Sequence, residues 1–187
     1  MLSQGRNGLK HISMLAVFGA MAMICSYIEI LIPFSFGIPG VKLGLPNLVT
    51  LILLYIGRED GDKIEKGRLF DAGIVLLIRI VLVSLLFTNL YSMLYSLAGG
   101  VCSLFIMWFF SGCGKISVIG CSILGGITHD LAQLAVAIAV VAQLKVVYYL
   151  PVLLLAGTLT GLLLGITAKI ILNRRGVLNA YDRFFER

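Results

Sequence analysis

Six long apolar runs, separated by short polar or charged stretches, constrain the fold of this 187-residue chain more than any other feature. The runs cover 12–32, 43–57, 71–88, 91–110, 118–141 and 147–172. A transmembrane helix needs about 20 mostly apolar residues. With 59% hydrophobic and 13% charged residues, the chain is too apolar for a water-soluble or a disordered protein. We predict an all-α polytopic membrane protein in which 1–187 form a single bundle of six transmembrane helices.

The basic residues predict how this bundle is oriented in the cell membrane, because Lys and Arg collect on the cytoplasmic side. Of the 15 Lys and Arg residues, twelve flank the runs on the side of the two termini. Lys42 and Lys145 lie on the opposite side, and Arg79 lies within a run. We therefore expect both termini in the cytoplasm. The net charge of +6 is explained in the same way, and nucleic acid is not expected as a partner.

The segment between the first two runs, 33–46, is apolar and is interrupted by glycine and proline. It suits neither a regular helix nor open water, so we predict that it folds over the outer face of the bundle as a lid. The second run has about 15 residues, roughly 22 Å as a helix, which is short of the ~30 Å hydrocarbon core. Charged residues at 58–62 fix its cytoplasmic end, so the missing length predicts a vestibule beneath the lid.

Three charged residues lie within the runs: Glu29, Arg79 and Asp130. An ionisable side chain at the bilayer centre costs about 2.5–3.5 kcal/mol, so each needs a partner or a wet cavity. Arg79 and Asp130 fall at the same depth on two runs. His129 and Gln133 share the face of Asp130 at helical spacing. These groups form either an ion pair that fixes the bundle or the lining of a ligand cavity. We favour the cavity, because the polar set exceeds what one ion pair needs.

Further polar residues lie near the predicted outer ends of the runs, and Glu29 needs compensation there because it lies about one turn inside the end of its run. The formal charges of Glu29, Lys42, Arg79 and Asp130 sum to zero, so the site does not require a strongly charged ligand. The predicted substrate-binding residues are Glu29, Lys42, Asn47, Arg79, Asn89, His129, Asp130 and Gln133.

Small residues recur at every fourth position in two of the runs, and helices in lipid associate through such faces. The last run carries a glycine stripe, defined as Gly157, Gly161 and Gly165. The first run carries an alanine patch, defined as Ala16, Gly19 and Ala20. We predict that the glycine stripe packs inside the bundle. The alanine patch either packs inside the bundle as well or binds another membrane protein.

The motifs of catalytic and metal sites are missing from the sequence. There is no G-x-x-x-x-G-K-[ST] phosphate loop, so any ATP-driven step needs another chain. There is no DDxxD motif to hold the magnesium ions of a prenyl-diphosphate transferase, and the four cysteines form no CxxC pair. We expect neither enzymatic activity nor a metal or cofactor.

Four segments of the sequence resemble the Gx transporter family, which is also described as heptaprenyl diphosphate synthase component I. They are 37–50 (GIPGVKLGLPNLVT), 79–87 (RIVLVSLLF), 95–100 (YSLAGG) and 125–133 (GGITHDLAQ). The resemblance covers roughly 12–172. The chain departs from the family pattern at Asp130, where Asn is expected, and at Pro46, where a small residue is expected.

The resemblance implies a function. Members of the family are similar to S components of energy-coupling-factor transporters, which are six-helix proteins that bind a vitamin-like solute from outside. S components work with a transmembrane T subunit and two ATPase subunits. Small residues of their first helix contact the T subunit, which matches Ala16 and Ala20, and the loop after that helix gates the site, which matches 33–46.

The expected function is therefore that of the substrate-binding subunit of an importer for a vitamin-like, isoprenoid or quinone-related solute. Two alternatives stay open. One is a non-catalytic membrane subunit associated with heptaprenyl diphosphate or quinone biosynthesis. The other is a proton-coupled carrier that uses Arg79, His129 and Asp130.

Overall fold

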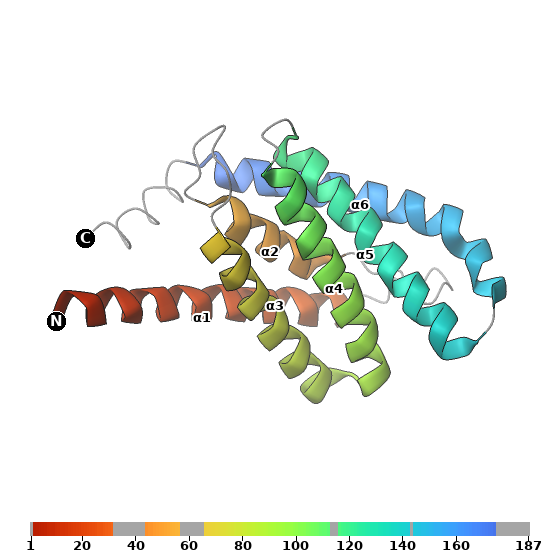
Figure 1. Ribbon diagram of the computed structural model, residues 1–187, viewed down its shortest axis with the longest axis horizontal. Coiled ribbons are helices and arrows are strands. Elements are labelled where there is room, and N and C mark those ends of the chain that lie inside the picture. The colour runs from red at the N-terminus through yellow and green to blue at the C-terminus, as the bar shows by residue number, and fades with distance from the viewer. Residues whose placement is uncertain (1, 32–43, 57–65, 113–115, 143, 175–187) are drawn as a thin grey trace.

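The computed structural model describes residues 2–31, 44–56, 66–112, 116–142 and 144–174, which form a bundle of helices (Figure 1). The helices are α1 (Leu2–Leu31), α2 (Leu45–Tyr55), α3 (Lys66–Phe87), α4 (Leu90–Ser111), α5 (Val118–Val141), the 3₁₀ helix η1 (Leu144–Tyr149) and α6 (Leu150–Leu172). Within these ranges there is no strand. Five of the helices are long and apolar enough to cross a membrane, namely α1, α3, α4, α5 and α6. The prediction of an all-α membrane protein is confirmed.

Most helices follow the predicted runs closely, and the differences lie at their ends. α4 and α5 agree with the predicted bounds to within one residue. α1 begins at Leu2 rather than at residue 12, because polar residues extend the helix beyond its apolar part. The last run starts as η1 and becomes α6 at Leu150. Pro151 favours this start, since the first helical turn does not use its missing backbone N–H.

The short helix α2 lies in the middle of the bundle. Its 11 residues span roughly 16 Å, which is shorter than a membrane crossing. Five described helices are long enough to cross, so the predicted number of six transmembrane helices is not confirmed. Residues 49–56 are all buried, because α2 is apolar on every side and packs against α1, α3, α4 and α6. The amino-terminal end of α2 is less buried, and Gly44, Pro46 and Asn47 there line a cavity.

The glycine stripe packs α6 against α5, as predicted. A Cβ atom on Gly161 would lie 2.7 Å from the Cα atom of Ile123, and one on Gly165 would lie 2.8 Å from the Cα atom of Ile119. On the facing helix, a Cβ atom on Gly126 would lie 2.5 Å from the carbonyl oxygen of Gly157. The two backbones therefore touch along most of their length, which is the small-residue packing typical of helices in lipid.

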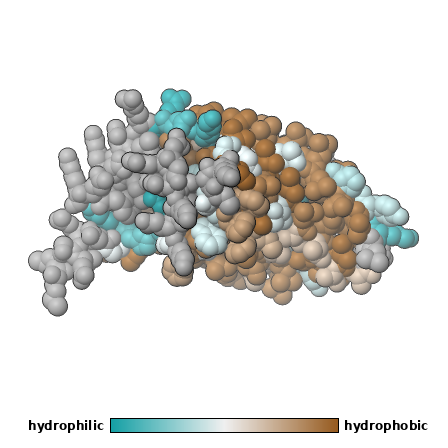
Figure 2. All heavy atoms as spheres, turned by 45° about the horizontal axis from the view of Figure 1, so that its top comes forward, coloured by the Kyte–Doolittle hydropathy of each residue, from teal (hydrophilic) through white to brown (hydrophobic). Residues whose placement is uncertain are grey.

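The surface of the bundle agrees with a membrane environment. Figure 2 shows a broad hydrophobic surface that separates hydrophilic groups at the two ends. α1 begins and α6 ends at the same end of the bundle (Figure 1). That this end faces the cytoplasm stays a prediction. The predicted lid, 33–46, lies outside the described residues apart from its last three. In these, Gly44 has a φ of 68° and forms the N-cap of α2.

Candidate functional site

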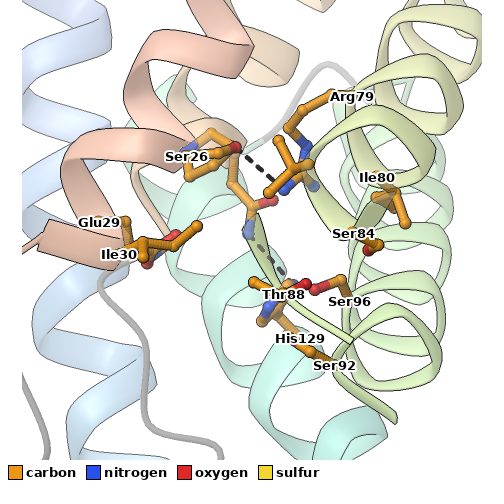
Figure 3. A pocket seen from close by; sticks show the side chains of 14 residues that line it. Ser26, Glu29, Ile30, Arg79, Ile80, Ser84, Thr88, Ser92, Ser96 and His129 are labelled. Atoms are coloured by element: carbon orange, nitrogen blue, oxygen red, sulfur yellow. Dashed lines mark hydrogen bonds between the residues drawn. The ribbon is translucent and has the colours of Figure 1, made fainter. Parts of the chain in front are cut away.

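A polar cavity of about 110 Å³ lies where α1, α3, α4 and α5 meet the amino-terminal end of α2 (Figure 3). We call it the midplane cavity. Its lining consists of Ser26, Glu29, Ile30, Gly44, Pro46, Asn47, Arg79, Ile80, Val83, Ser84, Thr88, Ser92, Ser96 and His129. Four of the predicted binding residues are thus brought together from four different helices: Glu29, Asn47, Arg79 and His129.

Arg79 is the cation of this cavity. It lies near the middle of α3 and is only 7% exposed. Its Nη1 atom donates to the hydroxyl oxygen of Ser26 on α1 at 3.4 Å, which is a long hydrogen bond (Figure 3). Among the described side chains, Arg79 and Asp130 do not come within ion-pair distance of each other. The guanidinium therefore faces the cavity without the carboxylate that the ion-pair alternative requires.

Glu29 holds the start of α2. Its Oε1 atom accepts a hydrogen bond from the backbone N–H of Gly44 at 2.5 Å. The first N–H groups of a helix have no partner within the helix and carry partial positive charge, so a carboxylate is stabilised there. This contact provides the compensation that the sequence demanded for Glu29, and it ties the last described turn of α1 to the first turn of α2.

His129 connects α2 and α5. Its Nδ1 atom lies 3.3 Å from the side-chain nitrogen of Asn47, and its Nε2 atom lies 3.0 Å from the side-chain nitrogen of Gln133. A neutral imidazole has one donor and one acceptor nitrogen, so only one of these amides can donate to it. The buried Gln133 Oε1 has no partner, and a half-turn of that amide directs this oxygen to Nε2–H. Asn47 then donates to Nδ1, which fixes the tautomer of the ring.

Gly99 on α4 makes room for this ring. A Cβ atom there would lie 2.8 Å from Cε1 of His129 and 3.0 Å from Cγ of Gln133. The imidazole therefore lies directly against the backbone of α4, and its edge is turned toward the midplane cavity (Figure 3). Gln133 itself does not line the cavity but supports His129 from behind.

Asp130 lies in a second, much smaller space, which we call the α5–α6 chamber. The chamber has a volume of about 10 Å³, enough for about one water molecule. Asp130 is 4% exposed, and its Oδ2 atom would be 2.8 Å from a Cβ atom on Gly157 of α6. Gly44, Asn47 and His129 line both spaces and so lie between the chamber and the midplane cavity. Arg79 and Asp130 therefore line different spaces.

The two other predicted binding residues are not placed at the cavity. Asn89 is exposed, and its Oδ1 atom accepts from the backbone N–H of Ser92 at 2.9 Å. It is the N-cap of α4, a common role for Asn before a helix. Lys42 lies outside the described residues. The described members of the predicted set are therefore four cavity residues, Gln133 as a support of His129, Asp130 in the α5–α6 chamber and Asn89 as a helix cap.

Comparison with known families identifies the family of this chain. The family described as heptaprenyl diphosphate synthase component I matches residues 18–171, which is most of the chain. The chain belongs to this family. Neither a curated protein nor a solved structure matches it.

This member of the heptaprenyl diphosphate synthase component I family has cavity residues that its sequence did not single out. They are hydroxyl groups on the walls of the midplane cavity: Ser26, Ser84, Thr88, Ser92 and Ser96. Helical spacing in the sequence could have identified these residues. Ser26 lies three residues before Glu29, and Ser92 and Ser96 are four residues apart, so each pair shares a helix face.

The alanine patch of this family member faces outward. Ala16 and Ala20 are exposed, and a Cβ atom on Gly19 would meet nothing within 4 Å. α1 packs instead through its opposite face, where Met14, Ala22 and Ser26 are buried. The sequence allowed two roles for the patch, internal packing and binding of another membrane protein. The described helices do not use the patch for internal packing.

Proposed function

We propose that this chain is the solute-binding membrane subunit of an importer of the energy-coupling-factor type. The midplane cavity is the observation that carries the proposal. It combines a buried cation, a carboxylate, an imidazole and five hydroxyl groups within a bundle of apolar helices. Polar groups inside a membrane protein are costly, and they mark ligand and ion pathways. A cavity with this lining suits a small polar solute.

The position of the cavity supports the same role. It reaches from the centres of α3 and α5 to the segment between α3 and α4, which includes Thr88. With both termini in the cytoplasm, as the basic residues predict, that segment lies on the outer side. The cavity would then receive its solute from outside the cell.

The exposed alanine patch supports a membrane partner. A smooth face of small residues allows another helix to approach closely in lipid. The chain has no phosphate-binding loop of its own, so an ATP-driven step must be supplied in trans. We therefore propose that Ala16, Gly19 and Ala20 contact a transmembrane T subunit, which couples this chain to two ATPase subunits.

A tagged chain purified from its native membranes in mild detergent tests this assignment. Mass spectrometry should identify a T subunit and ATPases in the purified material. Ala16→Trp or Ala20→Trp should reduce their recovery at least about tenfold, while the variants fold normally. Leu163→Trp is the matched control, because Leu163 is exposed on α6, far from the patch in sequence. Wild-type protein that purifies alone, or equal losses in all three variants, would contradict the proposal.

The family description gives one reason to keep a second candidate, a membrane subunit associated with heptaprenyl diphosphate synthesis. The chain lacks the acidic motif that such catalysis uses, so its role there would be non-catalytic. Deletion of the gene separates the candidates. A synthase that stays fully active in membranes without this chain excludes the second candidate, whereas loss of solute uptake at normal synthase activity favours the importer.

A further inference from the structure

We infer that the solute of the midplane cavity carries a single carboxylate group that pairs with Arg79. This inference rests on the proposed function and deepens it, because it names the chemistry of the ligand. The charges that line the cavity, and the contacts of each charge in the described part of the chain, point to this ligand.

Arg79 is the group with unused binding capacity. A guanidinium has five N–H donors, and within the described part of the chain Arg79 uses one of them, in a long hydrogen bond to Ser26. Its side chain is more than nine-tenths buried and is directed into the cavity (Figure 3). A buried charge is costly without a partner of opposite charge. An acceptor group of a ligand in the cavity would complete the hydrogen bonds of this guanidinium.

Among the described residues, no carboxylate lies within ion-pair distance of Arg79. Glu29 lines the cavity, but its Oε1 atom is bound to the N–H of Gly44 at the start of α2. Asp130 lies in the α5–α6 chamber, behind Asn47 and His129. Glu29 attracts the guanidinium from beyond ion-pair distance, and Asp130 does not line the cavity that Arg79 faces. A carboxylate on a ligand would give the guanidinium the direct, paired hydrogen bonds that neither side chain makes.

The lining selects a carboxylate over other anions. A carboxylate matches the planar guanidinium with two parallel hydrogen bonds and adds one negative charge. A phosphate or diphosphate adds more charge beside Glu29, and the cavity has one arginine to balance it. The five hydroxyl groups on the walls suit further polar groups of the ligand. A long polyprenyl chain fits neither this lining nor a volume of about 110 Å³.

The test is to identify the solute that copurifies with the protein. Wild-type chain is extracted from native membranes, and the small molecules released on denaturation are analysed by mass spectrometry before and after methyl esterification. We expect one compound, in about equal amount to the protein, whose mass increases by a single methyl ester. Its methyl ester should not rebind to the emptied protein, as followed by native mass spectrometry.

Variants at Arg79 connect this compound to the site. Arg79→Leu should reduce its recovery about tenfold or more, as expected for loss of a charge-assisted pair. Arg79→Lys keeps the positive charge but lacks the planar guanidinium, so it should reduce recovery less than Arg79→Leu does. Arg174→Leu is the control, because Arg174 is exposed beyond the end of α6. If Arg79→Leu does not fold, the comparison of Arg79→Lys and Arg79→Gln, with circular dichroism of each, replaces it.

The outcomes separate this inference from the proposed function. A compound without a carboxylate, a membrane phospholipid, or equal recovery from Arg79→Leu and the wild type would overturn the inference. If the copurified compound has no carboxylate but is no longer recovered from the Ser84→Leu variant, whose substitution lies in the cavity wall, the proposed function stands. Recovery of no solute from the wild type would contradict both.

Discussion

The two halves of the bundle are built in different ways. In the α4–α6 half, glycines bring the backbones of α5 and α6 into contact at Gly126, Gly161 and Gly165. In the α1–α3 half, the helices carry the charged groups of the midplane cavity, Glu29 and Arg79, and the alanine patch of α1 is uncovered. Backbones in contact leave little space between helices, and the α5–α6 chamber has a volume of only about 10 Å³. The α4–α6 half is thus the more closely packed one, although its His129 also lines the midplane cavity, while the α1–α3 half carries the two charged groups of that cavity and the exposed alanine patch.

The largest difference in stability between the halves should appear when a glycine in each half is replaced by leucine. Gly161→Leu should remove most of the folded protein, because its Cβ atom would meet the backbone of Ser122 and Ile123 below 3 Å. Overpacking of this kind costs about 1–3 kcal/mol or more. The measurement is the melting temperature and the monodisperse yield in detergent.

Gly19→Leu is the matched change in the α1–α3 half, where a Cβ atom has open space. It should leave the melting temperature nearly unchanged. If Gly19→Leu destabilises the protein as much as Gly161→Leu, the contrast between the halves is wrong.

A smaller effect is expected when one hydroxyl of the cavity wall is removed. Ser84→Ala should weaken binding of the copurified solute by roughly two- to tenfold, because a net hydrogen bond contributes about 0.5–1.5 kcal/mol. Retention of the solute during dilution, followed by native mass spectrometry, measures this. Ser111→Ala is the control, since the buried hydroxyl of Ser111 bonds to the carbonyl of Trp108 at the far end of α4. A similar loss in both variants would mean that Ser84 acts through folding.

The smallest expected effect is the coupling between the two midplane charges. Arg79 and Asp130 belong to different halves and point into different spaces, so Arg79→Leu and Asp130→Asn should act on stability independently. A double-mutant cycle in detergent should give a coupling energy below about 0.5 kcal/mol. A value of several kcal/mol would restore the ion pair as the reason for both charges.

The sequence predicted much of the fold because few backbone conformations can span a lipid bilayer. Long apolar runs must become helices, so α4 and α5 could be placed within a residue. The helical wheel put His129, Asp130 and Gln133 on one side of α5, and the sequence predicted the same depth for them as for Arg79. Depth does not determine the direction in which a side chain points, however. For that reason the sequence could not separate the midplane cavity from the α5–α6 chamber.

The cavity hydroxyls were missed for a related reason. Ser and Thr in an apolar helix can bond to a carbonyl of their own preceding turn, so they carry no obvious need for a partner. Ser26 does so with Ala22, and Thr128 does so with Leu124, yet only Ser26 lines the cavity. Asn89 was assigned to the site although its position just before an apolar run is typical of a helix cap.

Whether the midplane cavity holds a solute at Arg79 is decided by an experimental structure of the protein extracted from native membranes into lipid nanodiscs. We expect density for a small non-protein group inside the cavity, in contact with the guanidinium of Arg79 and close to Ser26 and Ser84. A cavity that contains only water, with Arg79 paired to Asp130, would show that no solute binds there.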